Sequence, residues 1–342
     1  MTAGHPSGPS SADGTLVLGA GLIGGLTARL LAAQGEKVVL ADLRRPTADA
    51  FGGTGSVETV ALDVRDFDGL CDLVRRHAIT RIVHTAALLS TAIRRDPLAG
   101  VAVNVLGTAN VLECARRMEL GRIVLASSTT VAYNTFATHG PQPLLEDDPI
   151  RPISERPASL YAVTKLTGEH LALAYHTLYG VDVVSLRYAA VLGGDLDAPT
   201  SVPGRLMQCL VSGAREGRDV VLDDPLLTWG GREEFVDARD CARANVHALR
   251  ARDPRQRVYH VATGQWCTLA EFVAAMQCLH PRLRVALGVE PTTGFAGFAH
   301  RRPAPSSTVA AQRDLGFECA FDLRQSLEFW TAPAATATLG GG

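Results

Sequence analysis

The segment Tyr161-Ala-Val-Thr-Lys165 places a phenol and an ammonium four residues apart. Because it lies in a helix-length stretch, both side chains are expected on one helix face. A free phenol has a pKa near 10, so proton transfer near pH 7 requires a fall of about three units, or about 4 kcal/mol. A fixed positive charge nearby stabilises the phenolate. The spacing therefore predicts an acid–base tyrosine; the alternative is an ordinary solvated helix face.

Lysine is rare in this chain, which makes Lys165 notable. Of the 33 basic residues only Lys37 and Lys165 are lysines, and the other 31 are arginines. A compact ammonium differs from a planar guanidinium in reach and in hydrogen-bonding geometry. The lysine that follows Tyr161 is therefore predicted to serve a chemical need.

A run of hydroxyl side chains, Ser127-Ser128-Thr129-Thr130, ends an apolar stretch expected to be a strand. Ligands of open α/β sheets bind beyond the carboxyl ends of the strands. A hydroxyl there can hold a substrate oxygen in line with the tyrosine, and we assign this role to Ser128, with Thr130 as a further substrate contact. The alternative is a polar strand end that caps a turn.

A glycine-rich turn follows the first expected strand and opens the first expected helix; it reads Gly19-Ala20-Gly21-Leu22-Ile23-Gly24. In this pattern Gly19 permits the tight turn, Gly21 lets the backbone approach a pyrophosphate, and Gly24 allows close helix–strand packing. The N–H groups of the helix N-terminus, including Leu22 and Ile23, face the phosphates. The turn predicts a dinucleotide site; a structural turn is the alternative.

Asp42 ends the second expected strand, 18 residues after Gly24. A carboxylate there accepts hydrogen bonds from ribose hydroxyls and repels a 2′-phosphate, so NAD is expected as the cofactor. Arg44 and Arg45 follow and could tolerate NADP. An oxidised nicotinamide and Lys165 could together supply the shift that the phenol requires.

Short apolar or β-branched runs alternate with helix-length segments along the first half of the chain. The expected strands are 15–18, 37–42, 57–63, 81–86, 121–128 and 181–188, and the expected helices are 22–34, 66–77, 97–118 and 158–179. Most of these strands are apolar on both faces, as in a sheet covered by helices on both sides. The alternation predicts right-handed βαβ units and an α/β fold with a Rossmann-type, doubly wound parallel sheet.

After Tyr188 the alternation stops, and Gly, Pro and Asp become frequent. We expect a NAD-binding domain of residues 14–188 plus about 232–264, and a smaller, discontinuous C-terminal substrate lobe of about 189–231 and 265–330. Residues 1–13 and 331–342 are expected to be a disordered leader and a disordered tail.

The composition excludes several classes of protein. A net charge of −2 gives no general attraction to nucleic acid or to an anionic membrane. No uninterrupted apolar segment reaches the roughly 18 to 20 residues of a membrane span, and the first residues lack the features of a signal peptide. Seven scattered cysteines without a C-x-x-C pair disfavour disulfides and a metal site. We expect a soluble cytoplasmic protein that binds a small molecule.

Together these residues resemble the extended short-chain dehydrogenase/reductases, which include the NAD-dependent epimerase/dehydratases. The resemblance covers about residues 15–330 and rests on GAGLIG, Asp42, Asp63-Val64, HTAA at 84–87, NVLGTANVLECAR at 104–116, SSTTV at 127–131, YAVTK, LRYAAVLG at 186–193 and LGF at 315–317. The glycine turn is one residue shorter than the usual turn of the family.

The resemblance implies further cofactor contacts. Asp63 and Val64 would flank the adenine, and Lys165 would also bond the nicotinamide ribose. The other implied contacts are Thr85, Ala86, Ala87, Asn104 and Tyr188. For Asp63 and Thr85 the alternative is ordinary strand-end polarity, and for Asn104 a structural amide. The family also implies a homodimer formed by helices 97–118 and 158–179.

Thr129 and Thr130 stand where family members that eliminate water or carbon dioxide place an acidic residue. A hydroxyl cannot replace a carboxylate in acid–base catalysis near neutral pH, so both eliminations are disfavoured. Two reactions remain: a dehydrogenase that releases NADH, and an epimerase that returns the hydride to the other face. A catalytically silent NAD-binding sensor or scaffold is a third, less favoured interpretation.

The residues that clamp a diphosphate in sugar-nucleotide epimerases are only partly present. Ala190 stands in place of an asparagine and Glu233 in place of an arginine, although the adjacent Arg232 could supply that arginine after a one-residue slip. Arg301 and Arg302 match a third anchor. Residues 86–90 and 175–188 are similar to short-chain-type L-threonine dehydrogenases. We therefore favour a dehydrogenase acting on a small polar, sugar-like or hydroxy-acid-like substrate, with Ser90 and Arg302 as possible substrate contacts.

Overall fold

The computed structural model describes residues 14–46, 57–150, 159–288 and 290–332. The expected leader, 1–13, and residues 333–342 of the expected tail lie outside the described residues. Helix α11 (Leu323–Thr331) extends through Thr331, which is buried, so the ordered chain continues one residue into the expected tail.

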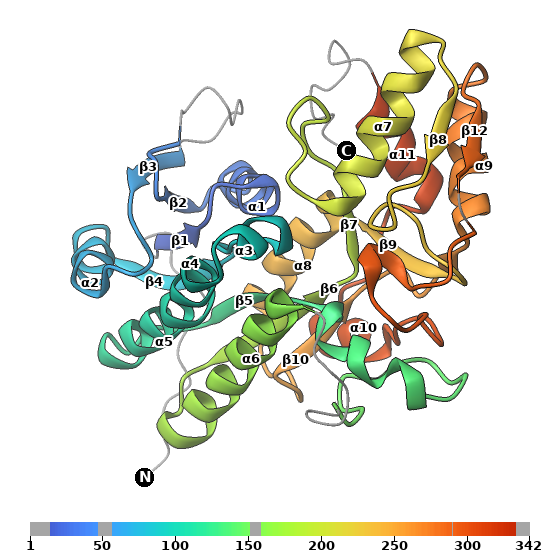
Figure 1. Cartoon of the computed structure of the whole chain (residues 1–342). Coiled ribbons are helices and arrows are strands. Elements are labelled where there is room, and N and C mark those ends of the chain that lie inside the picture. The colour runs from blue at the N-terminus through green and yellow to red at the C-terminus, as the bar shows by residue number, and fades with distance from the viewer. Residues whose placement is uncertain (1–13, 47–56, 151–158, 289, 333–342) are drawn as a thin grey trace.

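Seven parallel strands form the main sheet, in the order β10-β6-β5-β4-β1-β2-β3 (Figure 1). The strands are β1 (Gly14–Leu18), β2 (Lys37–Asp42), β3 (Val57–Ala61), β4 (Ile79–His84), β5 (Ile123–Ser128), β6 (Val183–Tyr188) and β10 (Val258–Val261). The six strands expected from the sequence are confirmed to within two residues at each end. The order reverses between β1 and β4, and ligands of doubly wound sheets bind at such a reversal.

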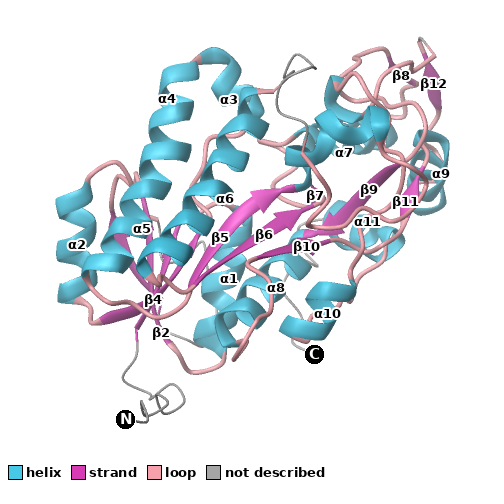
Figure 2. Cartoon of the chain, turned by 90° about the horizontal axis from the view of Figure 1, so that it is seen from below, coloured by secondary structure: helices cyan, strands magenta, loops and turns pink. Residues whose placement is uncertain are grey.

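Helices cover both faces of this sheet, as Figure 2 shows from below. One face carries α1 (Leu22–Ala33), α8 (Ala238–Arg250) and α10 (Val309–Leu315), and the other carries α2 (Phe67–Arg76), α5 (Gly107–Arg117) and α6 (Leu160–Tyr179). Successive strand residues point to opposite faces: Val17 joins the core under α1 and α8, whereas Leu16 and Leu18 join the core under α2 and α5. This doubly covered parallel sheet confirms the expected fold class.

The segment between β4 and β5 begins with α3 (Ser90–Arg95) and continues as one helical run, α4 (Pro97–Val101), η2 (Ala102–Leu106) and α5. The η2 turn is a π-helix, a feature that often marks functional sites. Among the described residues, the run Pro97–Arg117 is apolar enough to span a membrane by length and composition, with a mean hydropathy of 1.4. Here it packs against α2 and α6, and helices that cover a sheet have the same composition.

A third core, around Trp229, Phe235 and Phe272, lies beyond the carboxyl edge of the main sheet. Its elements are β7 (Ala190–Leu192), α7 (Val202–Glu216), β8 (Val220–Leu222), β9 (Glu233–Asp237), β11 (Trp266–Cys267), α9 (Leu269–Leu279), β12 (Val285–Leu287), η4 (Phe295–Gly297) and α11. Strand β9 pairs with β7 and β11, while α8, which follows β9 directly, covers the main sheet. The chain thus passes between the two parts at β7, after β9, between β10 and β11, and again on either side of α10.

Candidate functional site

The glycine turn between β1 and α1 is packed as tightly as its sequence predicts. Gly19 has a φ of +98°, and a Cβ there would lie 2.5 Å from the Ala86 nitrogen. A Cβ on Gly24 would lie 1.8 Å from the Gly19 carbonyl oxygen. At Gly21, in contrast, a Cβ would meet no protein atom within 4 Å, and no side chain caps the α1 N-terminus. The N–H groups of Leu22 and Ile23 at this end are therefore placed to receive a phosphate.

Asp42, at the end of β2, holds the glycine turn in place. One carboxylate oxygen accepts a hydrogen bond from the Ala20 N–H at 2.7 Å, and the other accepts one from the Leu43 N–H at 2.7 Å. Each carboxylate oxygen has a second acceptor site, so the group can still accept from ribose hydroxyls. Asp42 is half-buried, whereas Arg44 is exposed.

The residues after β3 and β4 line the same edge of the sheet. The Asp63 carboxylate is engaged by the Arg65 guanidinium, which holds its pKa below the ordinary value. Val64 is buried, and its carbonyl accepts a hydrogen bond from Asn110. The Thr85 hydroxyl donates to the Leu18 carbonyl at 2.9 Å, while Ala86 and Ala87 remain half-buried beside the turn.

Helix α6 presents Tyr161, Lys165 and Glu169 at successive intervals of four residues, so all three share one face. Ser159 caps this helix by accepting a hydrogen bond from the Ala162 N–H. The Lys165 ammonium donates to the Ala126 carbonyl of β5 at 2.8 Å and lies 5.8 Å from the centre of the Tyr161 ring. The pairing expected from the Tyr-x-x-x-Lys spacing is thus present in the structure.

A buried ion pair fixes this helix against the sheet. Arg187, on β6, forms a two-pronged contact with the Glu169 carboxylate, with the shortest N–O distance 2.8 Å. The Ser127 hydroxyl of β5 donates to the same carboxylate at 2.5 Å. All three side chains are buried, so this network joins α6, β5 and β6 directly behind the tyrosine and lysine.

Ser128, the last residue of β5, lies on the Tyr161 side of this network. Its oxygen accepts a hydrogen bond from the Thr130 hydroxyl at 3.0 Å. It also interacts with the Tyr161 phenol, whose pKa it lowers slightly against a larger opposing effect of burial. The structure thus brings Ser128, Thr130, Tyr161 and Lys165 together.

In the chain without its cofactor, burial raises the pKa of Tyr161 to about 12. The downward shift expected from the sequence requires an oxidised nicotinamide as well as Lys165. Burial also lowers the pKa of Lys165 to about 8, while Glu169 opposes that shift. Desolvation disfavours the charged form of each group, and the sequence could not show how far protein surrounds this half-buried side chain. Lys165 alone therefore does not lower the pKa of the Tyr161 phenol to near 7.

Two further predicted cofactor residues are engaged with protein groups. The Asn104 amide, on the π-helical turn, accepts from the Leu88 N–H at 2.8 Å and donates to the Thr164 hydroxyl at 3.1 Å. This is the structural amide that the sequence left open as an alternative. The Tyr188 hydroxyl, at the end of β6, donates to Asn245 of α8 at 2.6 Å.

Arg302 does not fit its expected role as a substrate contact. Its guanidinium is fully buried and contacts two carboxylates, Glu233 at 2.8 Å and Glu234 at 3.3 Å. Tyr133 donates to the other oxygen of Glu233 at 3.1 Å. A cation enclosed by two carboxylates has no charge left for a ligand. The pairing joins residues almost 70 positions apart, so spacing in the sequence could not predict it.

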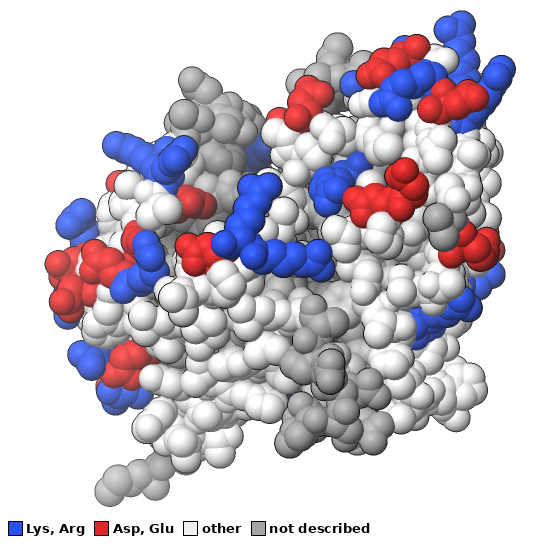
Figure 3. Space-filling view, viewed as in Figure 1, with Lys and Arg blue, Asp and Glu red and all other residues white. Residues whose placement is uncertain are grey.

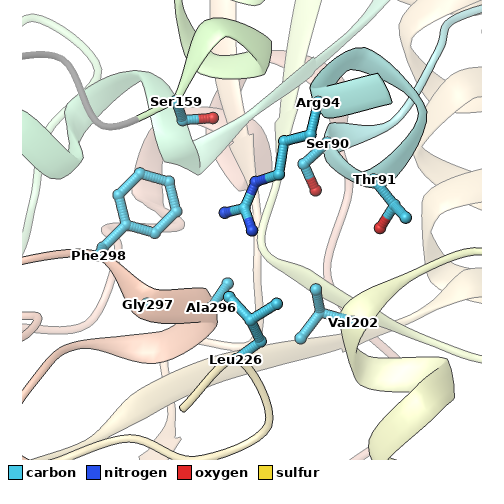
Figure 4. A pocket seen from close by; sticks show the side chains of 9 residues that line it. All are labelled: Ser90, Thr91, Arg94, Ser159, Val202, Leu226, Ala296, Gly297 and Phe298. Atoms are coloured by element: carbon cyan, nitrogen blue, oxygen red, sulfur yellow. The ribbon is translucent and has the colours of Figure 1, made fainter. Parts of the chain in front are cut away.

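A cleft that the sequence did not predict opens between α3 and the third core (Figure 4). Its lining residues are Ser90, Thr91, Arg94, Ser159, Val202, Leu226, Ala296, Gly297 and Phe298. Ser90, a predicted substrate contact, lies here, four residues before Arg94 on the same helix. The i, i+4 spacing from Ser90 could have identified Arg94 from the sequence. No such spacing points to the cleft residues that follow position 200 in the chain.

A second small cavity, of about 20 Å³, lies behind Lys165 and is large enough for one water molecule. His84, Thr108 and Gly168 are among the residues that line it. Burial, together with the Lys165 charge, lowers the pKa of His84 to about 3. This imidazole is therefore neutral at ordinary pH. Within the described ranges no group of three or more His, Cys, Asp or Glu side chains is arranged to hold a metal ion.

Comparison with known proteins agrees with this geometry. The model of the NAD dependent epimerase/dehydratase family matches residues 15–262. The chain belongs to this family. Mitochondrial L-threonine 3-dehydrogenase from Bos taurus is 27% identical over 326 residues, which cover 93% of this chain and 82% of that protein.

Solved structures of family members are similar over nearly the whole chain. UDP-glucose 4-epimerase of Thermus thermophilus in complex with NAD is 25% identical, with a TM-score of 0.73, over 93% of this chain and 97% of that one. MoeE5 in complex with UDP-glucuronic acid and NAD is 27% identical, with the same TM-score and the same coverage. The family is NAD-dependent, and the open space at Gly21 and the carboxylate at Asp42 fit this nucleotide. NAD is the cofactor of this chain.

Proposed function

We propose that this family member is a dehydrogenase that oxidises a secondary alcohol of a small polar substrate. The observation that carries this proposal is that Ser128, Tyr161 and Lys165 lie together at the carboxyl end of β5. An acid–base group, a hydroxyl that orients a substrate oxygen and a fixed cation are the three functions that alcohol oxidation requires of the protein.

The three side chains divide the work of one proton transfer. The Ser128 hydroxyl donates a hydrogen bond to the substrate oxygen, and the Tyr161 phenolate accepts the proton from the alcohol. Lys165, 5.8 Å from the Tyr161 ring, stabilises the phenolate and positions the nicotinamide ribose. Bound NAD would supply the hydride acceptor, C4 of its nicotinamide, for the hydrogen on the alcohol carbon. The substrate leaves as a ketone, and Tyr161 releases its proton to solvent.

The cofactor is assigned to the groups along the carboxyl edge of the sheet. The turn residues Gly19, Gly21 and Gly24, with the N–H groups of Leu22 and Ile23, would hold the pyrophosphate, and Asp42 the adenosine ribose. Asp63 and Val64 would flank the adenine, and Thr85, Ala86, Ala87 and Tyr188 would complete the site, with Asn104 acting through the loop that it anchors. The smaller lobe, assigned to about 189–231 and 265–330 and built around the third core, would hold the substrate against the NAD-binding domain.

We also propose a cytoplasmic homodimer. Eight of the thirteen large apolar side chains exposed among the described residues lie on 97–117 and α6: Leu98, Val101, Leu106, Leu160, Val163, Leu173, Leu178 and Tyr179. The surface over α6 is almost free of charge in Figure 3. Such a face favours association with a second copy. All seven cysteines are free thiols, as in a reducing compartment.

An epimerase acting on a nucleotide sugar is the second candidate, favoured by the likeness to the UDP-sugar enzymes above. Against it, Glu233 stands where an arginine clamps the diphosphate in such enzymes, and it neutralises Arg302, the remaining anchor. Ala190 offers no amide at a third position. A diphosphate would find two of its three expected partners replaced and the third one buried and paired.

The test is the Tyr161→Phe variant, examined for binding and for turnover. If Tyr161 accepts the proton, this variant binds NAD as the wild type does in a fluorescence titration but loses at least three orders of magnitude in kcat for every oxidised alcohol. Turnover that survives the loss of the phenol would contradict the assignment. A wild type that binds NAD but reduces none of it, with any alcohol, would support a sensor or scaffold instead.

A further inference from the structure

Arg94 reaches into the middle of the cleft between α3 and the third core, as Figure 4 shows. It lies in the last turn of α3, on the same face as Ser90. No ion pair or hydrogen bond holds its guanidinium among the residues that the structure describes. Arg94 is exposed at this position, whereas the buried Arg187 is paired with Glu169. A guanidinium that enters a cleft and has no carboxylate partner among the described residues can bind an anion.

The cleft adjoins the proposed catalytic residues. Ser159 lies in its wall and caps α6, two residues before Tyr161. Helix α3, which carries Arg94, packs against α6. In Figure 4 the Ser90 and Ser159 hydroxyls lie on two sides of the guanidinium, and the Thr91 hydroxyl lies further from it, beyond Ser90. A ligand held by Arg94 would therefore have hydroxyl groups close to it and would lie beside the helix that carries Tyr161.

The opposite wall is apolar and conformationally constrained. Ala296 has a φ of +56°, and Gly297 next to it has a φ of +77°. A left-handed conformation at alanine is unfavourable, and such residues concentrate at ligand sites. Phe298 is held by an edge-on contact with the Tyr133 ring, with the ring centres 4.3 Å apart. This wall is shaped to lie against the carbon chain of a small ligand.

The charge of the cleft indicates which anion it accepts. Arg94 is the one basic residue among its nine lining residues, and no acidic residue is among them. A single planar guanidinium matches the two oxygens and the single charge of a carboxylate. A nucleoside diphosphate would bring at least two charges, and the other arginine expected for it, Arg302, is neutralised by Glu233.

We propose that Arg94 binds a carboxylate of the substrate, so that the secondary alcohol oxidised at Tyr161 belongs to a hydroxy acid. The proposal rests on the function proposed above and adds to it the substrate class. In this arrangement the carboxylate lies on Arg94, the hydroxyls of Ser90 and Thr91 bind polar groups between, and the alcohol carbon reaches Ser128 and Tyr161.

The experiment measures binding without turnover. The enzyme is saturated with NADH, so that a hydroxy acid cannot be oxidised, and is titrated calorimetrically with 3-hydroxybutyrate, L-threonine and D-gluconate. Each acid is compared with its primary amide, which keeps the shape and loses the charge. We expect at least one acid to bind the wild type at least tenfold more tightly than its amide, because hydrogen bonds to charged groups are the strong ones.

Three variants test whether Arg94 causes the preference for the acid over its amide. Arg94→Ala and Arg94→Gln should weaken the binding of that acid about 10- to 100-fold and leave its amide unchanged. Arg95→Ala is the matched control, because Arg95 is the next residue of the same helix turn, is exposed, and is not part of the cleft. It should keep the full preference for the acid.

Several results would overturn the proposal: equal affinity for every acid and its amide, no binding of any of the three acids, or a preference that survives in Arg94→Ala. Tighter binding of glycerol 3-phosphate or UDP-glucose than of the acids, lost in Arg94→Ala, would assign the cleft to a phosphate instead. Measuring turnover distinguishes a failure of the proposed carboxylate site from a failure of the proposed oxidation. An acid that binds through Arg94 but yields no NADH with NAD would refute only the reaction. A hydroxy acid oxidised with the same kcat/KM by Arg94→Ala as by the wild type would refute only the role of Arg94 in binding the carboxylate.

Discussion

Replacing Lys165 separates the two roles that the structure gives this side chain: its charge and its position. Burial raises the pKa of Tyr161 to about 12, so the phenolate depends on nearby positive charge. The ammonium lies 5.8 Å from the ring centre. At an effective dielectric constant of about 20, a unit charge at that distance stabilises the phenolate by about 3 kcal/mol, which is about two pKa units.

Two substitutions separate the effect of the Lys165 charge from the effect of its position. Lys165→Met removes the charge, so the phenolate becomes less stable and its pKa rises. The acid limb of the pH profile of kcat for alcohol oxidation should therefore move about two units toward higher pH, with about a 100-fold loss of rate on the limb. Lys165→Arg keeps the charge, so the limb should move by less than one unit. Its plateau should nevertheless fall by one or more orders of magnitude, because a guanidinium cannot take the place of the ammonium against the Ala126 carbonyl.

The assay is the initial rate of NADH formation from about pH 6 to pH 10 at saturating NAD and substrate. A limb that stays in place in Lys165→Met would refute the argument from charge. A plateau that stays near the wild-type value in Lys165→Arg would refute the argument from position, and with it the significance of the single lysine on α6. Circular dichroism of both variants at each pH verifies that they remain folded.

Three other results are expected. Asp42→Ala should narrow the preference for NAD over NADP about tenfold in fluorescence titrations, because the carboxylate at the end of β2 repels a 2′-phosphate; equal wild-type affinities would contradict this. Glu169→Gln should lower the free energy of unfolding by about 3–5 kcal/mol in urea titrations, because Arg187 is left buried and unpaired. The double variant with both residues changed to Met should lose less, and an unchanged midpoint in Glu169→Gln would refute the role of the pair. Val163→Glu with Leu106→Glu should yield a folded monomer in light scattering, because both side chains are exposed on the proposed dimer face; a wild type that is itself a monomer at micromolar concentration would refute the dimer.

Local patterns in the sequence predicted most of the main sheet and the groups at its edge. The apolar strands and the glycine turn could be predicted because they depend on local constraints. At Gly24, for example, the structure leaves no room for a Cβ. The spacing of Tyr161 and Lys165 likewise predicted that both side chains lie on one face of α6, because residues four positions apart share a face in any α-helix.

What the sequence could not predict depends on burial and on partners far away in the chain. Arg302 was expected to face a substrate, but its neighbours across the fold are Glu233 and Glu234. The direction of the Tyr161 pKa shift depends on how much protein surrounds the phenol. Arg94 joins a cleft whose other wall lies more than 100 residues further along the chain, and no local pattern encodes that meeting.

The stoichiometry of NADH tests the central claim most directly. A dehydrogenase releases reduced cofactor in each turnover, whereas an epimerase keeps it until the hydride returns. The wild type is incubated with excess NAD and with hydroxy acids, polyols, free sugars, sugar acids or nucleotide sugars, while absorbance at 340 nm and the configuration of the product are followed. We predict one NADH for each molecule of a hydroxy acid consumed, with a ketone as the product. An epimerised nucleotide sugar formed without net NADH would contradict the account.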